Sequence, residues 1–150
     1  MWHTMFNAGN IIALIAWALL ILGPRKALVA AVILYCGVGL LCLAYAIGLL
    51  GLLTGTIDSG GSAAEAGFTT IEGVRAMSAN DAGVAIGWLH YLAFDLFVGL
   101  WIAKDADAKD FTRIVQAPIL MATFMAGPLG LLIWLAVREK RARSLHGRSK

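Results

Sequence analysis

Long apolar runs without a charged residue are the feature that most restricts what this chain can fold into. Residues 27–53 form one such run, which contains no Asp, Glu, Lys or Arg. A helix needs about 20 apolar residues to cross the hydrocarbon core of a bilayer, so this run is long enough to span it with some tilt. In the whole chain 60% of residues are hydrophobic and 14% are charged, whereas soluble domains are roughly half apolar and about a quarter charged. The sequence therefore predicts an integral membrane protein.

Apolar runs separated by polar segments predict an all-α polytopic membrane protein with four transmembrane helices in one domain of 150 residues. Gly23-Pro24 ends the first expected span, because a proline disfavours helix at the residue before it. Gly127-Pro128 interrupts the last expected span and is expected to kink it. The expected spans are residues 6–22, 27–53, 82–103 and 114–137.

The polar segments between and after the spans carry four further predictions. The longest, residues 54–81, is Gly-rich at its start and is expected to begin as a loop. Thr69-Thr70-Ile71-Glu72 then matches a capping box and predicts a short interfacial or re-entrant helix before the third span. Asn80-Asp81 is expected to cap the third span. The basic tail, residues 138–150, is expected to be disordered or to lie on the lipid surface.

The distribution of Lys and Arg predicts the topology. Half of the twelve basic residues lie in the tail, so the net charge of +3 does not indicate nucleic-acid binding. Four spans place both termini on the side of the second loop, with seven basic residues there against five opposite. Because cytoplasmic segments carry the excess of basic residues, we expect both termini in the cytoplasm. No plastid transit peptide precedes the first apolar run, which favours a bacterial inner membrane.

Two ionisable residues, His90 and Asp95, lie inside the third expected span. Ionisable residues are costly in a bilayer and indicate a functional site by default. The other interpretation is a hydrogen-bonded pair that fixes helix packing. Five positions rotate a helix by about 500°, so the two side chains point about 140° apart and cannot chelate one metal ion. Apolar surroundings favour a protonated carboxyl, which would let Asp95 act as a general acid near neutral pH.

Helical periodicity divides the polar and aromatic side chains of this span into two stripes. One stripe is an aromatic wall that is either core, lipid-facing surface or the lining of a site for a flat apolar ligand: His90, Phe94, Phe97 and Trp101. The other places an acid beside a phenol, with space expected above Gly99: Trp88, Tyr91, Asp95 and Gly99. Glu72 and Arg75 precede the span. Asp105 and Arg113 bracket the loop after it and are expected to be able to pair.

Several kinds of chemistry have no support in the sequence. No Walker loop, dinucleotide fingerprint, nucleophile elbow or Cys/His metal cluster occurs, so we expect no cofactor and no metal. Cys36 and Cys42 fall on different faces of one helix, which argues against a disulfide between them. Glycines recur along residues 27–53 and predict close helix packing, either within the chain or in a homo-oligomer.

The chain resembles the abscisic acid-deficient 4 family of four-span membrane proteins over nearly its whole length. The block of residues 88–102 is the most specific part, because charged residues at this spacing in a span are rare. The motifs that carry the resemblance are Trp88-Leu89-His90, Asp95-Leu96-Phe97, Asp105, Thr112-Arg113 and Gly127-Pro128-Leu129-Gly130, with residues 68–74, Asn10, Trp17 and Pro24 upstream.

Plant members of that family are needed to make neoxanthin from violaxanthin, so the resemblance implies a cofactor-independent isomerase of a carotenoid or isoprenoid-like lipid. By the same resemblance Asp95 is the acid and His90 the base, while Asp105 and Arg113 support or bind. The aromatic stripe would stack along the polyene, and further binding residues are Trp88, Tyr91 and Glu72. One alternative is a non-catalytic carotenoid or lipid binder, or an accessory subunit of a membrane complex. Another is a small transporter or channel.

Overall fold

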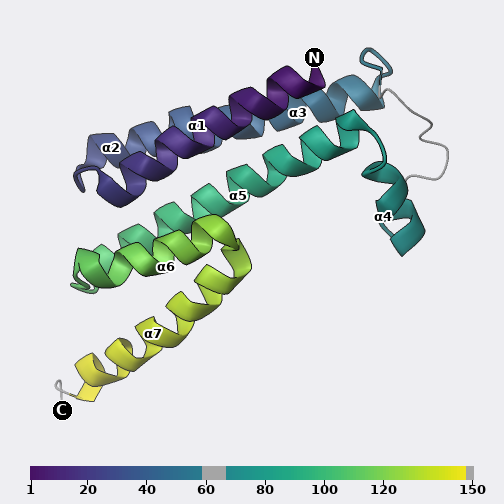
Figure 1. Ribbon diagram of the computed structural model, residues 1–150. Helices are drawn as coiled ribbons and strands as arrows, with labels where there is room; N and C mark the ends of the chain where they lie inside the picture. Colours follow the sequence, from purple (N-terminus) through teal and green to yellow (C-terminus); the bar gives the residue numbers. More distant parts are fainter. Residues whose placement is uncertain (59–66, 148–150) are drawn as a thin grey trace.

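The computed structural model of this protein is all-α and describes residues 1–58 and 67–147 (Figure 1). Most of the expected Gly-rich loop and the last three residues of the tail lie outside the described residues. α2, the π-helical segment η1 and α3 follow one another directly and form one rod. The elements are α1 (Trp2–Leu22), α2 (Ala27–Val32), η1 (Ile33–Gly39), α3 (Leu40–Leu53), α4 (Ile71–Met77), α5 (Asp81–Ala108), α6 (Arg113–Met125) and α7 (Gly127–Gly147).

Among the described residues, three helices are long and apolar enough to cross a membrane, namely α1, the α2–η1–α3 rod and α5. The rod has the bounds that its uncharged run predicts, residues 27–53. At 1.5 Å per residue the 28 residues of α5 extend about 42 Å, which exceeds a hydrocarbon core of about 30 Å. α5 is therefore long enough to run past one interface, beyond the predicted end of the third span at residue 103.

Local sequence explains where these helices begin and end. At the end of α1, Gly23 is extended, with φ −71° and ψ 165°, because Pro24 follows it. After α3 the chain turns at Gly55, whose φ of 69° lies in the left-handed region that glycine enters without strain. The Asn80 side chain caps α5 by accepting a hydrogen bond from the Gly83 backbone N–H at 2.8 Å, as predicted.

The short helix before the third span is present as α4. Its N-cap is Thr70, whose hydroxyl accepts a hydrogen bond from the backbone N–H of Gly73 at 3.0 Å. The cap is one residue later than a capping box built on Thr69 and Glu72 requires. α4 lies beside the N-terminal end of α5 and outside the bundle (Figure 1). Its apolar residues Ile71 and Val74 are exposed, as expected of a helix at a membrane interface.

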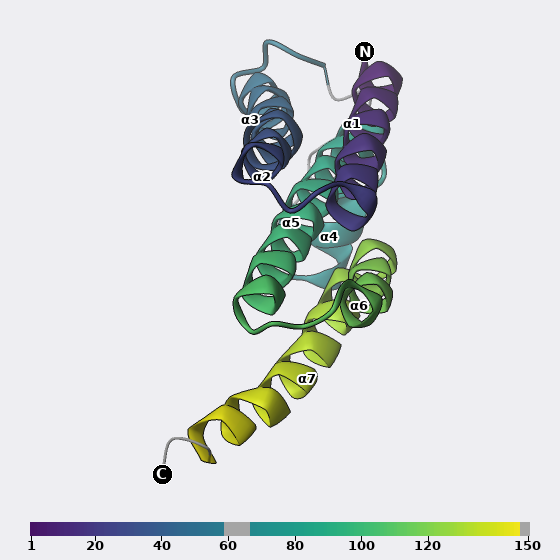
Figure 2. The ribbon, with the colours of Figure 1, turned by 90° about the vertical axis from the view of Figure 1, so that its left-hand side faces the viewer.

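α5 is the central helix of the bundle. It packs against α1, η1, α3, α6 and α7, and Figure 2 shows α1 and the α2–α3 rod on one side of it and α6 on another. Burial of its apolar positions against these neighbours provides the main packing of the domain. The largest fully buried side chains of the described residues are Trp134, Leu20, Ile33, Leu41, Leu89, Leu96, Ile102 and Leu120, with Gln116 and Thr123.

α6 and α7 form a helical hairpin and not one kinked span (Figure 1). α6 runs back along α5, and α7 then returns, so that Trp134 and Arg138 reach Asp105 near the C-terminal end of α5. The 13 residues of α6 extend about 20 Å, too short to cross the core. Between the two helices Ala126 leaves the helical conformation, with φ −156° and ψ 87°. The predicted fourth span, residues 114–137 with a kink at Gly127-Pro128, therefore corresponds to two helices that meet at the predicted break.

The hairpin also bears on the expected topology. Trp2 packs with Ala82 at the start of α5, whereas Arg138 pairs with Asp105 near its end. These contacts place the N-terminus and Arg138 at opposite ends of the bundle. The prediction that both termini lie on one side of the membrane stays a prediction, and this arrangement offers the opposite topology as its alternative. The tail backbone is helical to Gly147, which differs from the first of the two expectations, disorder, and leaves the second, a tail on the lipid surface, as a prediction.

Candidate functional site

Asp95 lies halfway along α5, the position at which a crossing helix is deepest in the bilayer. Its side chain is buried, with 8% exposed, and it points toward the break between α6 and α7. The apolar residues Leu92 and Leu96 beside it on α5 are buried as well. A carboxyl in this position is far from bulk water and depends on a few neighbouring polar groups.

The nearest of those groups is the backbone of Gly127, the first residue of α7. A Cβ built on Gly127 would clash with Oδ1, Cγ and Oδ2 of Asp95, so the carboxyl occupies the space that a side chain would need. Pro128 suits this position, because proline fits the first turn of a helix and its missing N–H leaves no donor unsatisfied. The carboxyl therefore sits at the positive end of α7, where its charge is favourable.

Tyr91 approaches the same carboxyl from one turn earlier on α5. Its hydroxyl donates a hydrogen bond to the Met125 carbonyl at 3.3 Å, at the end of α6. The pairing of acid and phenol on one stripe, predicted from their spacing of four, is confirmed. Oδ2 of Asp95 is nevertheless buried without a hydrogen-bond partner among the described residues. A buried oxygen without a hydrogen-bond partner costs free energy, and a proton or a polar ligand atom at Oδ2 would remove that cost.

A row of stacked rings leads from the N-terminal end of the bundle to this carboxyl. Trp88 stacks on Tyr91 with ring centroids 5.2 Å apart and on Phe6 with centroids 5.7 Å apart. The Trp88 indole donates a hydrogen bond to Oδ1 of Asn10 at 2.9 Å and so joins α5 to α1. The site thus includes residues of α1 that the third span alone could not reveal.

The space expected above Gly99 is filled. A Cβ on Gly99 would clash with the ring of Trp17 on α1. Trp17 itself makes an edge contact with Phe124 of α6, with centroids 5.5 Å apart. Gly99 therefore permits close packing of α1 against α5, and the prediction of open space at this position is wrong.

The aromatic stripe that begins with His90 lies on a different face of α5 from Asp95. His90 is exposed and stacks with Phe94 at a centroid distance of 4.6 Å. Phe97 and Trp101 continue the stripe and are also exposed. The stripe therefore lies on the outer surface of α5 and is not core, and the structure does not bring His90 and Asp95 together.

The remaining predicted residues lie at the ends of the bundle. Asp105 is bonded to Lys109, to Arg138 at 3.0 Å and to the Trp134 indole at 3.1 Å. Arg113 instead donates a hydrogen bond to the Gly23 carbonyl, so the expected pairing of Asp105 with Arg113 is wrong. Glu72 is exposed on α4, beyond the opposite end of α5.

A second polar cluster, which the sequence did not reveal, joins the loop after α1 to α5 and α6. Arg25 donates a hydrogen bond to Oε1 of Gln116 at 2.8 Å, and its Nε lies 3.4 Å from Oδ2 of Asp107. Gln116, which is buried, donates in turn to Asp107 at 2.7 Å and to the Phe111 carbonyl at 2.9 Å. Burial lowers the pKa of the Arg25 guanidinium from its ordinary value, and the charge of Asp107 opposes that shift.

Among the side chains that the structure describes, those of residues 1–58 and 67–139, no three His, Cys, Asp or Glu residues are grouped so that they could hold a metal ion. The two cysteines, Cys36 and Cys42, are exposed free thiols on the α2–η1–α3 rod. Asp95 and Tyr91 are groups that can transfer a proton or form hydrogen bonds halfway along α5.

The three long apolar helices in the described part of the chain indicate an integral membrane protein, and one of them, α5, carries the buried carboxyl of Asp95. The family model of the ABA4-like proteins, ABA DEFICIENT 4-like, matches residues 4–134. The chain therefore belongs to the ABA DEFICIENT 4-like family, and the resemblance seen in its motifs is confirmed. No curated protein and no solved structure matches the chain.

Proposed function

We propose that this protein is a membrane-embedded isomerase of a carotenoid or isoprenoid-like lipid, with Asp95 as its proton donor. The buried, unpartnered Oδ2 of Asp95 is the observation on which the proposal rests. A protonated carboxyl in this position can give its proton to an oxygen of a bound lipid at the depth of the polyene or isoprenoid chain. Membership in the ABA DEFICIENT 4-like family supports the choice of substrate class.

In a reaction of the neoxanthin-forming type, the acid protonates the epoxide oxygen and the C–O bond breaks. A proton then leaves the neighbouring polyene carbon, so the allenic alcohol is an isomer of the epoxide and no oxidant or reductant is consumed. Asp95 would supply the first proton. Tyr91, whose hydroxyl lies beside Asp95, is better placed than the outward-facing His90 to pass the second proton back.

The contact of Asp95 with Gly127 favours a second candidate function. In that case the carboxyl holds the start of α7 and fixes the α6–α7 hairpin, and the protein binds a carotenoid or lipid without changing it. The exposed stripe of His90, Phe94, Phe97 and Trp101 would then be the surface on which a polyene lies in the bilayer.

Lipid analysis of cells that express Asp95→Asn separates the two candidates. Asparagine keeps the size of the side chain and can still accept from the backbone, but it cannot donate a carboxyl proton. We expect the isomeric product to disappear while the purified protein stays folded and retains co-purified lipid. Asp81→Asn, an exposed carboxyl at the start of α5, is the matched control and should leave the product unchanged. Unchanged product in a folded Asp95→Asn protein would exclude Asp95 as the proton donor.

We also propose that the end of the bundle formed by the loop after α1 and the α5–α6 turn faces the cytoplasm of a bacterial inner membrane. Six of the basic residues described with side chains lie at that end, and five more follow Arg138 in the sequence. Only Arg75 lies at the other end among the described residues. This bias is much larger than the seven against five of a four-span topology and supports a cytoplasmic C-terminus. The six residues are Arg25, Lys26, Lys104, Lys109, Arg113 and Arg138.

A further inference from the structure

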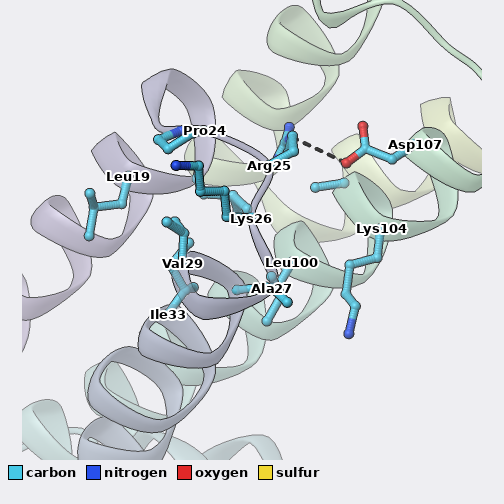
Figure 3. A pocket seen from close by; sticks show the side chains of 13 residues that line it. Leu19, Pro24, Arg25, Lys26, Ala27, Val29, Ile33, Leu100, Lys104 and Asp107 are labelled. Atoms are coloured by element: carbon cyan, nitrogen blue, oxygen red, sulfur yellow. Dashed lines mark ion pairs between the residues drawn. The ribbon is translucent and has the colours of Figure 1, made fainter.

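We propose that a pocket between α1, α2 and α5 at the basic end of the bundle binds an anionic membrane phospholipid (Figure 3). The phosphate would lie among the cations at the mouth, and the first methylene groups of one acyl chain would enter the pocket. The pocket lies at the opposite half of α5 from Trp88 and does not include Asp95, so the proposal is independent of the proposed isomerase reaction and rests on the proposed cytoplasmic orientation of the basic end.

The interior of the pocket is apolar and of moderate size. It encloses about 230 Å³. An apolar cavity of about 150 Å³ is large enough to bind benzene, so this pocket has room for a short length of hydrocarbon chain and not for a whole lipid. The rest of the chain would leave past Leu19, which is partly exposed at the pocket wall. The apolar lining includes Leu19, Leu20, Val29, Ile33, Leu100 and Ala103.

The mouth of the pocket has an excess of positive charge. Arg25, Lys26 and Lys104 line it together with one acidic residue, Asp107. Arg25 is turned toward Asp107, and the dashed line in Figure 3 marks this ion pair of 3.4 Å. Neither Lys26 nor Lys104 has an ion-pair partner among the described residues, and Figure 3 shows them on opposite sides of Ala27. The two ammonium groups are thus left to neutralise an anion.

The depth of the pocket favours a lipid over a soluble anion. α1 ends and α2 begins at this mouth, and the last turns of α5 project beyond the hydrocarbon core. Lys26 and Lys104 therefore lie at the level of the head groups, with apolar side chains directly below them. Basic pockets between transmembrane helices on the cytoplasmic side are suited to anionic head groups, since that leaflet holds the anionic lipids.

Binding of short-chain lipids to the full-length protein in mild detergent tests the proposal. The ligands are dioctanoyl phosphatidylglycerol, dioctanoyl phosphatidylcholine and inorganic phosphate, each titrated against the midpoint of thermal unfolding. The variants are Lys26→Gln/Lys104→Gln, which removes the two free charges, and Ala30→Phe, which fills the pocket. Arg75→Gln removes one exposed charge at the opposite end of the bundle and is the control.

We expect phosphatidylglycerol to bind at least about tenfold more tightly than phosphatidylcholine, because two lysines without an ion-pair partner among the described residues line the pocket and attract its charge. The double variant should lose that preference without weaker binding of phosphatidylcholine, and Ala30→Phe should weaken both lipids. Arg75→Gln should behave as the wild type. Equal binding of the two lipids, or an unchanged preference in the double variant, would overturn the proposal. Binding of inorganic phosphate as tight as that of phosphatidylglycerol would also overturn it, since the site would then be one for a free anion.

Discussion

Trp134 of α7 donates a hydrogen bond from its indole N–H to Oδ2 of Asp105 on α5, across 3.1 Å. The two residues are 29 positions apart in the sequence. Ten residues before Asp105 on the same helix, Asp95 lies against Gly127 at the start of α7. Two contacts in this order require α7 to run parallel to α5. The α6–α7 hairpin therefore enters the bundle from the basic end and returns to it.

The hairpin predicts that the two termini lie on opposite sides of the membrane. A reporter that fluoresces only in the cytoplasm should be bright when fused after residue 150 and dark when fused before residue 1. The physical reason is that three helices cross and the basic residues at the second end favour the cytoplasm. Fluorescence of both fusions would contradict the hairpin and restore a topology with four crossings.

A side chain at position 127 should destabilise the protein. In Gly127→Ala the new Cβ meets the Asp95 carboxyl and the backbone at the start of α7 has to shift. Overpacking of this kind costs typically about 1–3 kcal/mol. The free energy of unfolding of the purified protein, measured by denaturant titration in mild detergent, should fall by that amount.

Two further variants make this test specific. Gly87→Ala lies on the same helix as Asp95 with no atom within 4 Å of its new Cβ, and it should be neutral or stabilise by up to about 1 kcal/mol. Asp95→Ala removes the group that Gly127→Ala meets, so the double variant should be less destabilised than the sum of the single variants. Additive losses would show that the clash with Asp95 is not the cause.

The α2–η1–α3 rod and α5 show how much of the fold the sequence could predict. The rod has the predicted bounds because the polar residues Lys26 and Thr54 lie at the two ends of an uncharged run. The polar ends favour water, and the apolar residues between them favour the bilayer. The cap of α5 by Asn80 could also be predicted, because it depends only on residues that are close together in the sequence. The π-helical segment η1 has no such local signal, and neither does the reversal at Gly127-Pro128. A break of this kind permits a kink or a hairpin, and contacts with α5 decide between them.

Prediction of the site succeeded for residues on one helix and failed for residues on different helices. The spacing of Tyr91 and Asp95 places them on one face, because positions four apart lie above one another. Periodicity also separates His90 from Asp95. The contact of Asp95 with Gly127 and the partners of Asp105 depend on how α7 returns, which no single helical pattern contains. Asp105 was therefore assigned a partner from its own loop, Arg113, and its actual partners come from α7.

The bond from Trp134 to Asp105 should contribute measurably to stability. Trp134→Phe keeps a buried ring against Phe111 but removes the indole N–H that reaches the carboxylate. Loss of a hydrogen bond to a charged group costs about 1.5–3 kcal/mol. Trp88→Phe is the control, because its indole donates to the neutral Asn10 at a partly exposed position, and it should cost about 1 kcal/mol or less. Denaturant titration of the two variants should rank them in this order, and equal losses would refute it.

Gln116 should be one of the most sensitive polar positions in the chain, because it is almost wholly buried and joins three segments. Its amide accepts from Arg25 and donates to Asp107 and to the Phe111 carbonyl. Gln116→Leu keeps the volume but removes three hydrogen bonds, two of them to the charged groups of Arg25 and Asp107, at an expected cost of about 3 kcal/mol in the free energy of unfolding. Thr123→Val, also fully buried on α6, loses a single bond to the Ile119 carbonyl and should cost only about 1 kcal/mol. If Gln116→Leu were no more damaging than Thr123→Val, the cluster around Arg25 would not hold the end of the bundle together.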